Sequence, residues 1–198
     1  ELDDARRLCA QLGVPLTVLE LDALADAAVA VNPPDRCYFC KRNLFGALCA
    51  RASADGYTFL IDGTNASDDA GDRPGMRALR EMSVRSPLRE CGLTKPEIRR
   101  LSREAGLFTW DKPAYACLAT RIPSGEALTA GKLQKTEAAE AFLFSLGLTD
   151  FRVRMFSGAA RIQAPASQLE TILAHREEIL RGLKQYYPAV LLDLEVRG

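Results

Sequence analysis

Residues 58–65, with the sequence TFLIDGTN, decide the fold class that the sequence predicts. A short apolar run that ends in Gly, Thr and Asn is typical of a buried strand followed by a turn. A second strand is expected at 15–21, and helices are expected at 2–12, 37–51 and 95–106. Because helices and strands alternate, this part of the sequence predicts an α/β layer domain.

The sequence changes in character after Gly125 and predicts a second, smaller domain. A strong amphipathic helix at 133–146 is followed by a hairpin, another helix and a final strand. We therefore predict two domains: an α/β domain at 1–124 and an α+β domain of order αββαβ at 125–198. The chain begins inside a helix, whereas an α/β domain normally begins with a strand, so we expect further sequence upstream.

Composition restricts the class of protein. The 198 residues are 47% hydrophobic and 26% charged, which is typical of a soluble globular protein. Lys and Arg number 26, as do Asp and Glu, and this zero net charge disfavours a nucleic-acid binder. The sequence has neither the ~18-residue apolar run of a membrane span nor a signal peptide. With six cysteines, too few for a disulfide scaffold, we expect a reduced cytoplasmic protein without membrane or nucleic-acid partners.

Two cysteines form a C-x-x-C motif at Cys37 and Cys40. The motif alone fits a redox pair, half of a zinc site or two incidental cysteines on a helix. A zinc site needs further ligands, and the sequence has no second C-x-x-C and a single histidine, His175. A four-ligand zinc site is therefore disfavoured.

A third cysteine, Cys117, stands between the cations Lys112 and Arg121, which favour its thiolate. Three thiolates leave one iron of an iron–sulfur cluster without a protein ligand, and that iron can bind an external sulfide. The remaining cysteines are expected to be packing or bystander residues, since free cysteine is readily buried. They are Cys9, Cys49 and Cys91.

The segment after the strand expected at 58–62 contains candidate ligands for a nucleotide. Ligands of α/β proteins bind at the carboxyl ends of strands, and amide and carboxylate oxygens suit polar groups or Mg²⁺. A glycine lets the backbone approach a ligand, and a guanidinium suits phosphate or carboxylate. A plain turn with an exposed charge fits equally well. The candidates are Asp62, Gly63, Asn65, Asp68 and Arg73.

Arg152 and Arg154 alternate on one expected strand and therefore point to the same face. Arg161 on the partner strand can join them. This arrangement predicts a phosphate clamp, with a solvated sheet face paired to acids as the alternative.

The chain contains five longer motifs in a fixed order: RCYFCK at 36–41, DGTNASDD with DRPG at 62–75, SPLRECGLTKPEIR at 86–99, WDKPAYACLATRIPSG at 110–125, and RVR with ARI at 152–162. These motifs resemble those of the LarE family, and the resemblance extends from about residue 1 to the end of the chain. LarE proteins are ATP-dependent sulfur transferases that help to make the nickel-pincer nucleotide cofactor of lactate racemase.

The resemblance implies a PP-loop domain, an adenine nucleotide α-hydrolase-like and Rossmann-like fold, followed by a small C-terminal domain used in oligomer formation. It implies pyridinium-3,5-biscarboxylic acid mononucleotide as substrate. Each carboxylate is adenylated with ATP and Mg²⁺, and sulfur then displaces AMP to give a thiocarboxylate. A homo-oligomer is also implied, a hexamer built from trimers.

Family members are of two chemical kinds: one sacrifices a cysteine sulfur, and the other carries three cysteines and a [4Fe-4S] cluster. Cys37, Cys40 and Cys117 indicate the cluster kind, with Cys117 also as a catalytic residue. A cation suits the negative charge that develops at the attacked carboxylate. We expect Arg121 in that role, Arg152 and Arg154 on phosphate, and the candidates at 62–73 on the nucleotide.

Two departures from the family pattern matter. The S-G-G-x-D-S loop that cradles ATP phosphates is absent, so we expect either a fragment or a remnant unable to adenylate. Gln163 stands where relatives commonly carry Glu, which puts an acidic site there in doubt. Two other functions stay open: tRNA thiolation by a PP-loop enzyme, which zero net charge disfavours, and a non-catalytic nucleotide-binding module.

Overall fold

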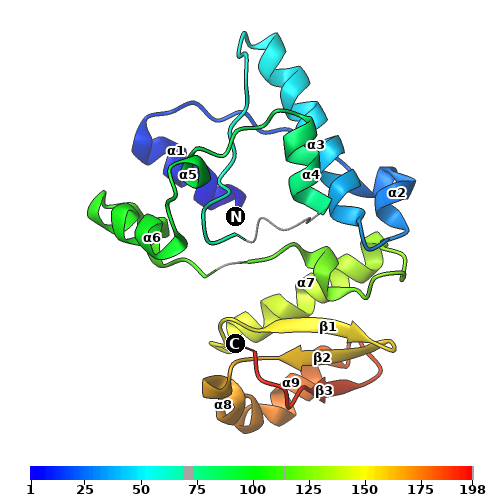
Figure 1. Ribbon diagram of the computed structural model, residues 1–198. Helices are drawn as coiled ribbons and strands as arrows, with labels where there is room; N and C mark the ends of the chain where they lie inside the picture. The colour runs from blue at the N-terminus through cyan, green and yellow to red at the C-terminus, as the bar shows by residue number, and fades with distance from the viewer. Residues whose placement is uncertain (69–73, 114, 198) are drawn as a thin grey trace. The chain divides into compact units, whose positions relative to one another are not determined.

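The computed structural model describes residues 1–68, 74–113 and 115–197 as a helix-rich, mixed α/β chain (Figure 1). These residues form two compact units. The first unit comprises Glu1–Ala23 and Asp35–Lys112, and the second comprises Leu24–Pro34 and Pro113–Gly198. The functional domain boundary expected near residue 124 stays a prediction.

The first unit consists of helices joined by extended segments. Two expected helix signals are confirmed: Gly13 ends the first helix in the left-handed conformation, and Thr94 with Glu97 forms a capping box. The helices are α1 (Leu2–Leu12), α3 (Arg36–Ala54), α4 (Pro74–Glu81), α5 (Pro87–Glu90), α6 (Lys95–Glu104) and the 3₁₀ turn η2 (Phe108–Asp111).

The two strands expected in the first unit are not ladder strands, which corrects the sequence analysis. Segment 15–21 is extended without strand pairing to any described residue. The segment expected at 58–62 forms one isolated parallel bridge, Ile61 to Arg85, and Ile61 is 61% exposed rather than buried. Both segments line one cavity beside α3. The residue pattern of both segments favours an extended backbone. A β-strand also needs a neighbouring strand that supplies its hydrogen bonds.

The second unit contains the expected order of elements from its long helix onward. The helix expected at 169–183 is divided into two at His175, where the backbone leaves the helical conformation. The elements are η1 (Ala23–Ala25, at the unit boundary), α2 (Ala27–Ala30), η3 (Leu118–Arg121), α7 (Ala130–Ser145), β1 (Arg152–Phe156), β2 (Ala159–Gln163), η4 (Ala166–Gln168), α8 (Leu169–Ala174), α9 (Arg176–Leu183) and β3 (Val190–Leu192).

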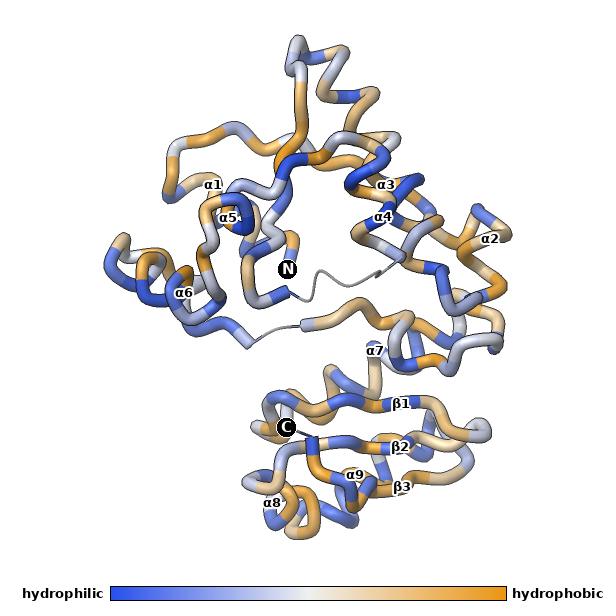
Figure 2. Tube along the Cα trace, viewed as in Figure 1, coloured by the Kyte–Doolittle hydropathy of each residue, from blue (hydrophilic) through white to orange (hydrophobic). Residues whose placement is uncertain are grey.

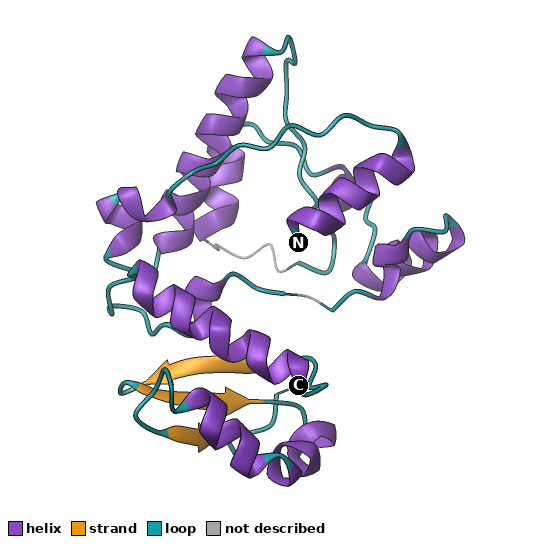
Figure 3. Ribbon diagram, turned by 180° about the vertical axis from the view of Figure 1, so that it is seen from behind, coloured by secondary structure: helices purple, strands orange, loops and turns teal. Residues whose placement is uncertain are grey.

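A three-stranded sheet of order β1-β2-β3 carries the core of the second unit. β1 and β2 are antiparallel, β2 and β3 are parallel, and α7 and α9 cover one face (Figure 3). Val153 and Met155 of β1 are buried, whereas Arg154 and Phe156 are exposed. Figure 2 shows both hydrophilic and hydrophobic residues along β1. Within the described residues, no helix combines the length and apolar character that a membrane crossing requires.

Candidate functional site

Cys37 and Cys40 lie one turn apart near the start of α3. The Cys37 thiol is exposed and Cys40 is half-buried. Side chains three residues apart share a helix face, and Nη2 of Arg36 lies 3.6 Å from the Cys37 sulfur. Two thiols on one face beside a guanidinium form an arrangement that can hold a metal group as thiolates.

Helix α4 packs directly against this cysteine-bearing turn, at a residue that the sequence analysis did not select. Gly75 is buried, and a Cβ added there would lie 3.2 Å from Cδ of Lys41 and 3.7 Å from Cβ of Cys37. A larger residue at 75 would therefore displace Lys41 or the helix. The DRPG motif was the available signal, because a glycine in a motif marks a close approach.

Cys117 belongs to the second unit, where it precedes η3 and is exposed. Its carbonyl accepts a hydrogen bond of 2.8 Å from the Thr120 hydroxyl. The three expected cluster ligands are thus divided between the two units. In the described residues no group of three His, Cys, Asp or Glu side chains is placed to hold a metal ion.

The Asp62 carboxylate is the centre of a hydrogen-bond network in the first unit. It accepts from the Thr64 hydroxyl at 2.6 Å, the Ser86 hydroxyl at 2.6 Å and the Thr64 amide at 3.2 Å. Partial burial acts to raise the pKa of Asp62, but hydrogen bonds from Ser86 and Thr64 outweigh it and keep the pKa below its ordinary value. Asp62 is therefore an ionised group that orders this loop.

The loop after Asp62 is held by hydrogen bonds within itself and by contacts with residues 89–95. Asp68 accepts from the Asn65 amide at 2.9 Å, and the Asn65 side chain accepts from the Ser67 amide at 3.0 Å. Arg89 donates to the Asp68 carbonyl at 2.8 Å. A Cβ at Gly63 would meet no atom within 4 Å, so no described residue requires glycine there. Arg73 lies outside the described residues.

The arginines of the hairpin gather on one side of the sheet. Arg154 lies opposite Arg161 in the β1–β2 register, and Arg152 lies opposite Gln163. Burial and the nearby cations Arg121, Arg161 and Arg197 lower the pKa of Arg154. Like charges that face each other across a ladder destabilise a sheet, and here Asp193 partly offsets them, because its carboxylate lies 3.5 Å from Nε of Arg161. Gln163, at the position of the doubtful acid, donates to Asp193 at 2.7 Å.

Arg121 lies in a buried ion pair with Glu140 of α7, a partner that the sequence analysis missed. Nε and Nη2 of Arg121 lie 2.8 and 3.0 Å from the two carboxylate oxygens, and the two side chains are 0% and 1% exposed. Burial, and then the hydrogen bond and charge of Glu140, raise the pKa of Tyr115. The available signal was the position of Glu140 on the same helix stripe as Thr136, Ala139 and Leu143, because an acid on a buried stripe requires a partner.

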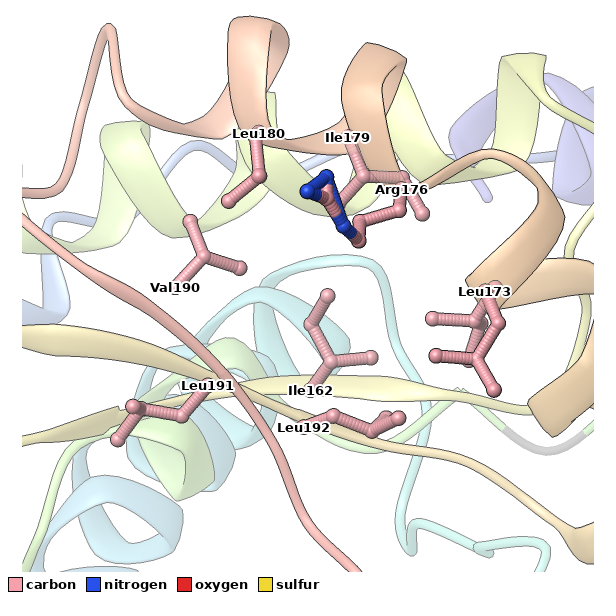
Figure 4. A pocket seen from close by; sticks show the side chains of 9 residues that line it. Ile162, Leu173, Arg176, Ile179, Leu180, Val190, Leu191 and Leu192 are labelled. Carbon is pink, nitrogen blue, oxygen red and sulfur yellow. The ribbon is translucent and has the colours of Figure 1, made fainter.

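A separate apolar cavity of about 310 Å³ lies among β2, β3, α8 and α9 (Figure 4). Its lining is aliphatic apart from Arg176, and none of the predicted site residues lines it. An aliphatic lining offers few hydrogen bonds to a nucleotide, so we do not place the substrate there.

Comparison with known proteins identifies relatives along nearly the whole chain, although no family model matches it. An uncharacterized protein of Synechocystis sp. is 38% identical over 198 residues, covering 98% of this chain and 74% of the relative. The pyridinium-3,5-bisthiocarboxylic acid mononucleotide synthase of Lactiplantibacillus plantarum is 33% identical, covering 98% and 71%. A tRNA-specific 2-thiouridylase of Rhizobium rhizogenes is 30% identical over 57% of this chain and 36% of its own length.

These relatives indicate both the broad class of the protein and its family. The match to the thiouridylase suggests a PP-loop relationship for the mixed α/β chain. The chain belongs to the LarE family, that of the pyridinium-3,5-bisthiocarboxylic acid mononucleotide synthase, as the sequence motifs predicted.

Proposed function

We propose that this chain is an ATP-dependent sulfur transferase that converts the carboxylates of pyridinium-3,5-biscarboxylic acid mononucleotide into thiocarboxylates for a nickel-pincer nucleotide cofactor. The observation that carries the proposal is the 33% identity to the named synthase over 98% of this chain. Because that match includes residues of both units, it supports a shared activity better than a match to one motif would. We propose, in addition, that the protein is a cytoplasmic homo-oligomer.

We assign a [4Fe-4S] cluster to Cys37, Cys40 and Cys117, on the chemistry of their side chains. All three are cysteines outside disulfides, two of them share a helix turn, and thiolates are the ligands of such clusters. When bound, the cluster supplies an iron without a protein ligand, at which sulfide for transfer can be held.

The carboxylate must be activated before sulfur can replace its oxygen. In the proposed reaction, a carboxylate oxygen attacks the α-phosphorus of ATP and pyrophosphate leaves. Sulfur then attacks the acyl carbon and AMP leaves with the original oxygen. We assign contacts with ATP and Mg²⁺ to the 62–73 loop, through Asp62, Gly63, Asn65, Asp68 and Arg73.

Arg152 and Arg154 are proposed to bind the phosphate of the mononucleotide. Arg154 is exposed and lies opposite Arg161 in the β1–β2 register, and partial desolvation together with neighbouring cations lowers its pKa. Arg161 already has Asp193 as an ion-pair partner at 3.5 Å, and a phosphate would neutralise the remaining positive charge and accept hydrogen bonds from planar guanidinium groups.

The test is anaerobic reconstitution followed by an assay with ATP, Mg²⁺ and the biscarboxylic acid mononucleotide. We expect about four irons per chain and a product in which sulfur has replaced a carboxylate oxygen, detected by mass spectrometry. Cys37→Ala, Cys40→Ala and Cys117→Ala should each abolish cluster and product, whereas the matched controls Cys9→Ala, Cys49→Ala and Cys91→Ala should retain both. Full iron in any of the first three would contradict the ligand assignment.

Thiolation of tRNA is the second candidate, because one relative is a tRNA-specific 2-thiouridylase. That relative matches a smaller share of the chain, and the net charge of zero gives RNA little electrostatic attraction. A reconstituted protein that thiolates tRNA and leaves the mononucleotide unchanged would establish this second function instead.

A further inference from the structure

Glu140 connects two parts of the second unit that the proposed function uses separately. Its carboxylate accepts from Arg121 through both oxygens, from the Tyr115 hydroxyl at 2.8 Å and from the Val153 amide at 2.9 Å. Tyr115 and Arg121 belong to the segment that contains Cys117. Val153 lies between Arg152 and Arg154 on β1.

The Arg121 guanidinium also holds the backbone around Cys117. Its Nη1 lies 3.1 Å from the Ala116 carbonyl, 3.4 Å from the Cys117 carbonyl and 2.9 Å from the Thr120 hydroxyl. The Thr120 amide donates to the same Cys117 carbonyl at 3.0 Å. The backbone that carries the sulfur is therefore held by a rigid, planar group fixed to α7.

Stability alone does not explain a buried pair of this kind. Removing two charges from water costs free energy, and replacing such a pair by apolar residues of similar volume is often neutral or stabilising. A carboxylate with four donors from a loop, a 3₁₀ turn and a strand instead fixes the relative positions of those segments.

We propose that Arg121 and Glu140 form a positioning pair, which sets the location of the Cys117 sulfur relative to Arg152 and Arg154. The inference rests on the proposed function. It adds how the sulfur is positioned relative to a substrate whose phosphate is bound by Arg152 and Arg154. Arg121 acts through the loop and not on the substrate, because its side chain is 0% exposed and directed to Glu140 and to backbone carbonyls.

Two variants separate positioning from stability. Arg121→Lys keeps the charge opposite Glu140 but lacks the planar fork that holds two carbonyls as well. The double variant Arg121→Met with Glu140→Gln removes both charges, and the new side-chain amide can still accept from the Val153 amide through its carbonyl oxygen. The control is Thr136→Val, which removes the 2.9 Å hydrogen bond to Tyr187 one turn earlier on α7.

The first readout is amide hydrogen exchange, which does not require activity. The amides of Thr120 and Ile122 donate to the carbonyls of Cys117 and Ala119, and we expect them to exchange about tenfold faster in both variants while α7 is unchanged. Thr136→Val should leave these two amides at the wild-type rate. Wild-type exchange in both variants, or global unfolding of both, would overturn the proposal.

The second readout is sulfur transfer with the mononucleotide. We expect kcat to fall about tenfold in both variants, with KM changed less than about twofold, because the phosphate contacts remain. A double variant with wild-type kcat and faster loop exchange would also overturn the proposal. If the wild-type protein transfers no sulfur, the proposed function fails, and the exchange data still decide whether the pair holds the loop.

Discussion

At the residue scale, the charge of single side chains is stabilised by neighbours that are distant in sequence. Asp62 accepts a hydrogen bond from Ser86, 24 residues away, and Arg121 donates one to Glu140, 19 residues away. The first contact stabilises a negative charge, and the second neutralises a positive one in a buried place. The chemistry of each group is therefore a property of the fold around it.

We predict that Asp62 makes stability depend on pH. The folded pKa lies below the ordinary value, so the unfolded state binds protons first as pH falls. This contribution is complete above the ordinary aspartate pKa and is lost as pH falls through the lowered folded pKa. Asp62→Asn should therefore cost about 1 kcal/mol at pH 7 and progressively less in acid, measured by denaturant unfolding.

The matched control for this prediction is Asp3→Asn, an exposed carboxylate in an ion pair with Arg6. Its effect on the free energy of unfolding should be close to zero, because exposed ion pairs contribute little. The assignment would be contradicted if Asp62→Asn lowered the free energy of unfolding by the same amount at acid pH as at pH 7.

At the element scale, the hairpin β1–β2 has one apolar face that stabilises the sheet and one face whose like charges lower its stability. Val153 pairs with Ile162 on the covered face, whereas Arg154 pairs with Arg161 on the other. Cross-strand apolar pairs stabilise a sheet and like charges oppose it. A charge arrangement that costs stability is typical of a binding site.

We predict that Arg154→Gln stabilises the protein and weakens substrate binding. Loss of the repulsion should raise the free energy of unfolding by about 0.5 kcal/mol at low salt. KM for the mononucleotide should rise about tenfold or more, because a charge-assisted hydrogen bond is lost. Thermal unfolding and steady-state kinetics measure the two effects.

The control for Arg154 is Lys184→Gln, which removes a cation from the end of α9 instead of from the sheet. It should leave KM unchanged. A variant of Arg154 that keeps wild-type KM would exclude this residue from the phosphate site.

At the scale of the whole molecule, the chain enters the second unit early, leaves it and returns. Asn32 holds the early segment: its side chain donates to the carbonyls of Pro123 at 2.8 Å and Glu126 at 3.0 Å, and its carbonyl accepts from Gly125. Asn32 is fully buried and has a φ of 56°. Asparagine suits both demands, since it tolerates the left-handed conformation and has an amide donor.

We predict that Asn32→Ala costs about 2–4 kcal/mol, because it removes the hydrogen bonds of a buried side chain to partly buried carbonyls and strains the backbone. Asn32→Gly, which accepts the positive φ, should cost less by about 1 kcal/mol. Urea unfolding measures both. Equal costs would show that the hydrogen bonds alone matter, and a negligible cost for alanine would refute the role of Asn32.

The sequence by itself determined most of the long helices, the helix ends at Gly13 and Thr94, the hairpin, the family and the candidate cysteines. Caps and turns are local interactions, as at Thr94 with Glu97, and motifs are read directly from residue order. The ligand roles of Cys37, Cys40 and Cys117 and the role of the 62–73 loop stay predictions.

Only the tertiary structure decided whether segments 15–21 and 58–62 are paired β-strands, and which residue is the partner of Arg121. An extended segment becomes a strand when another strand supplies its hydrogen bonds, and residue pattern does not name that partner. A charge is exposed, bound to substrate or buried in a pair according to what packs around it. Burial and pairing are non-local, and for Arg121 they depend on Glu140 of α7.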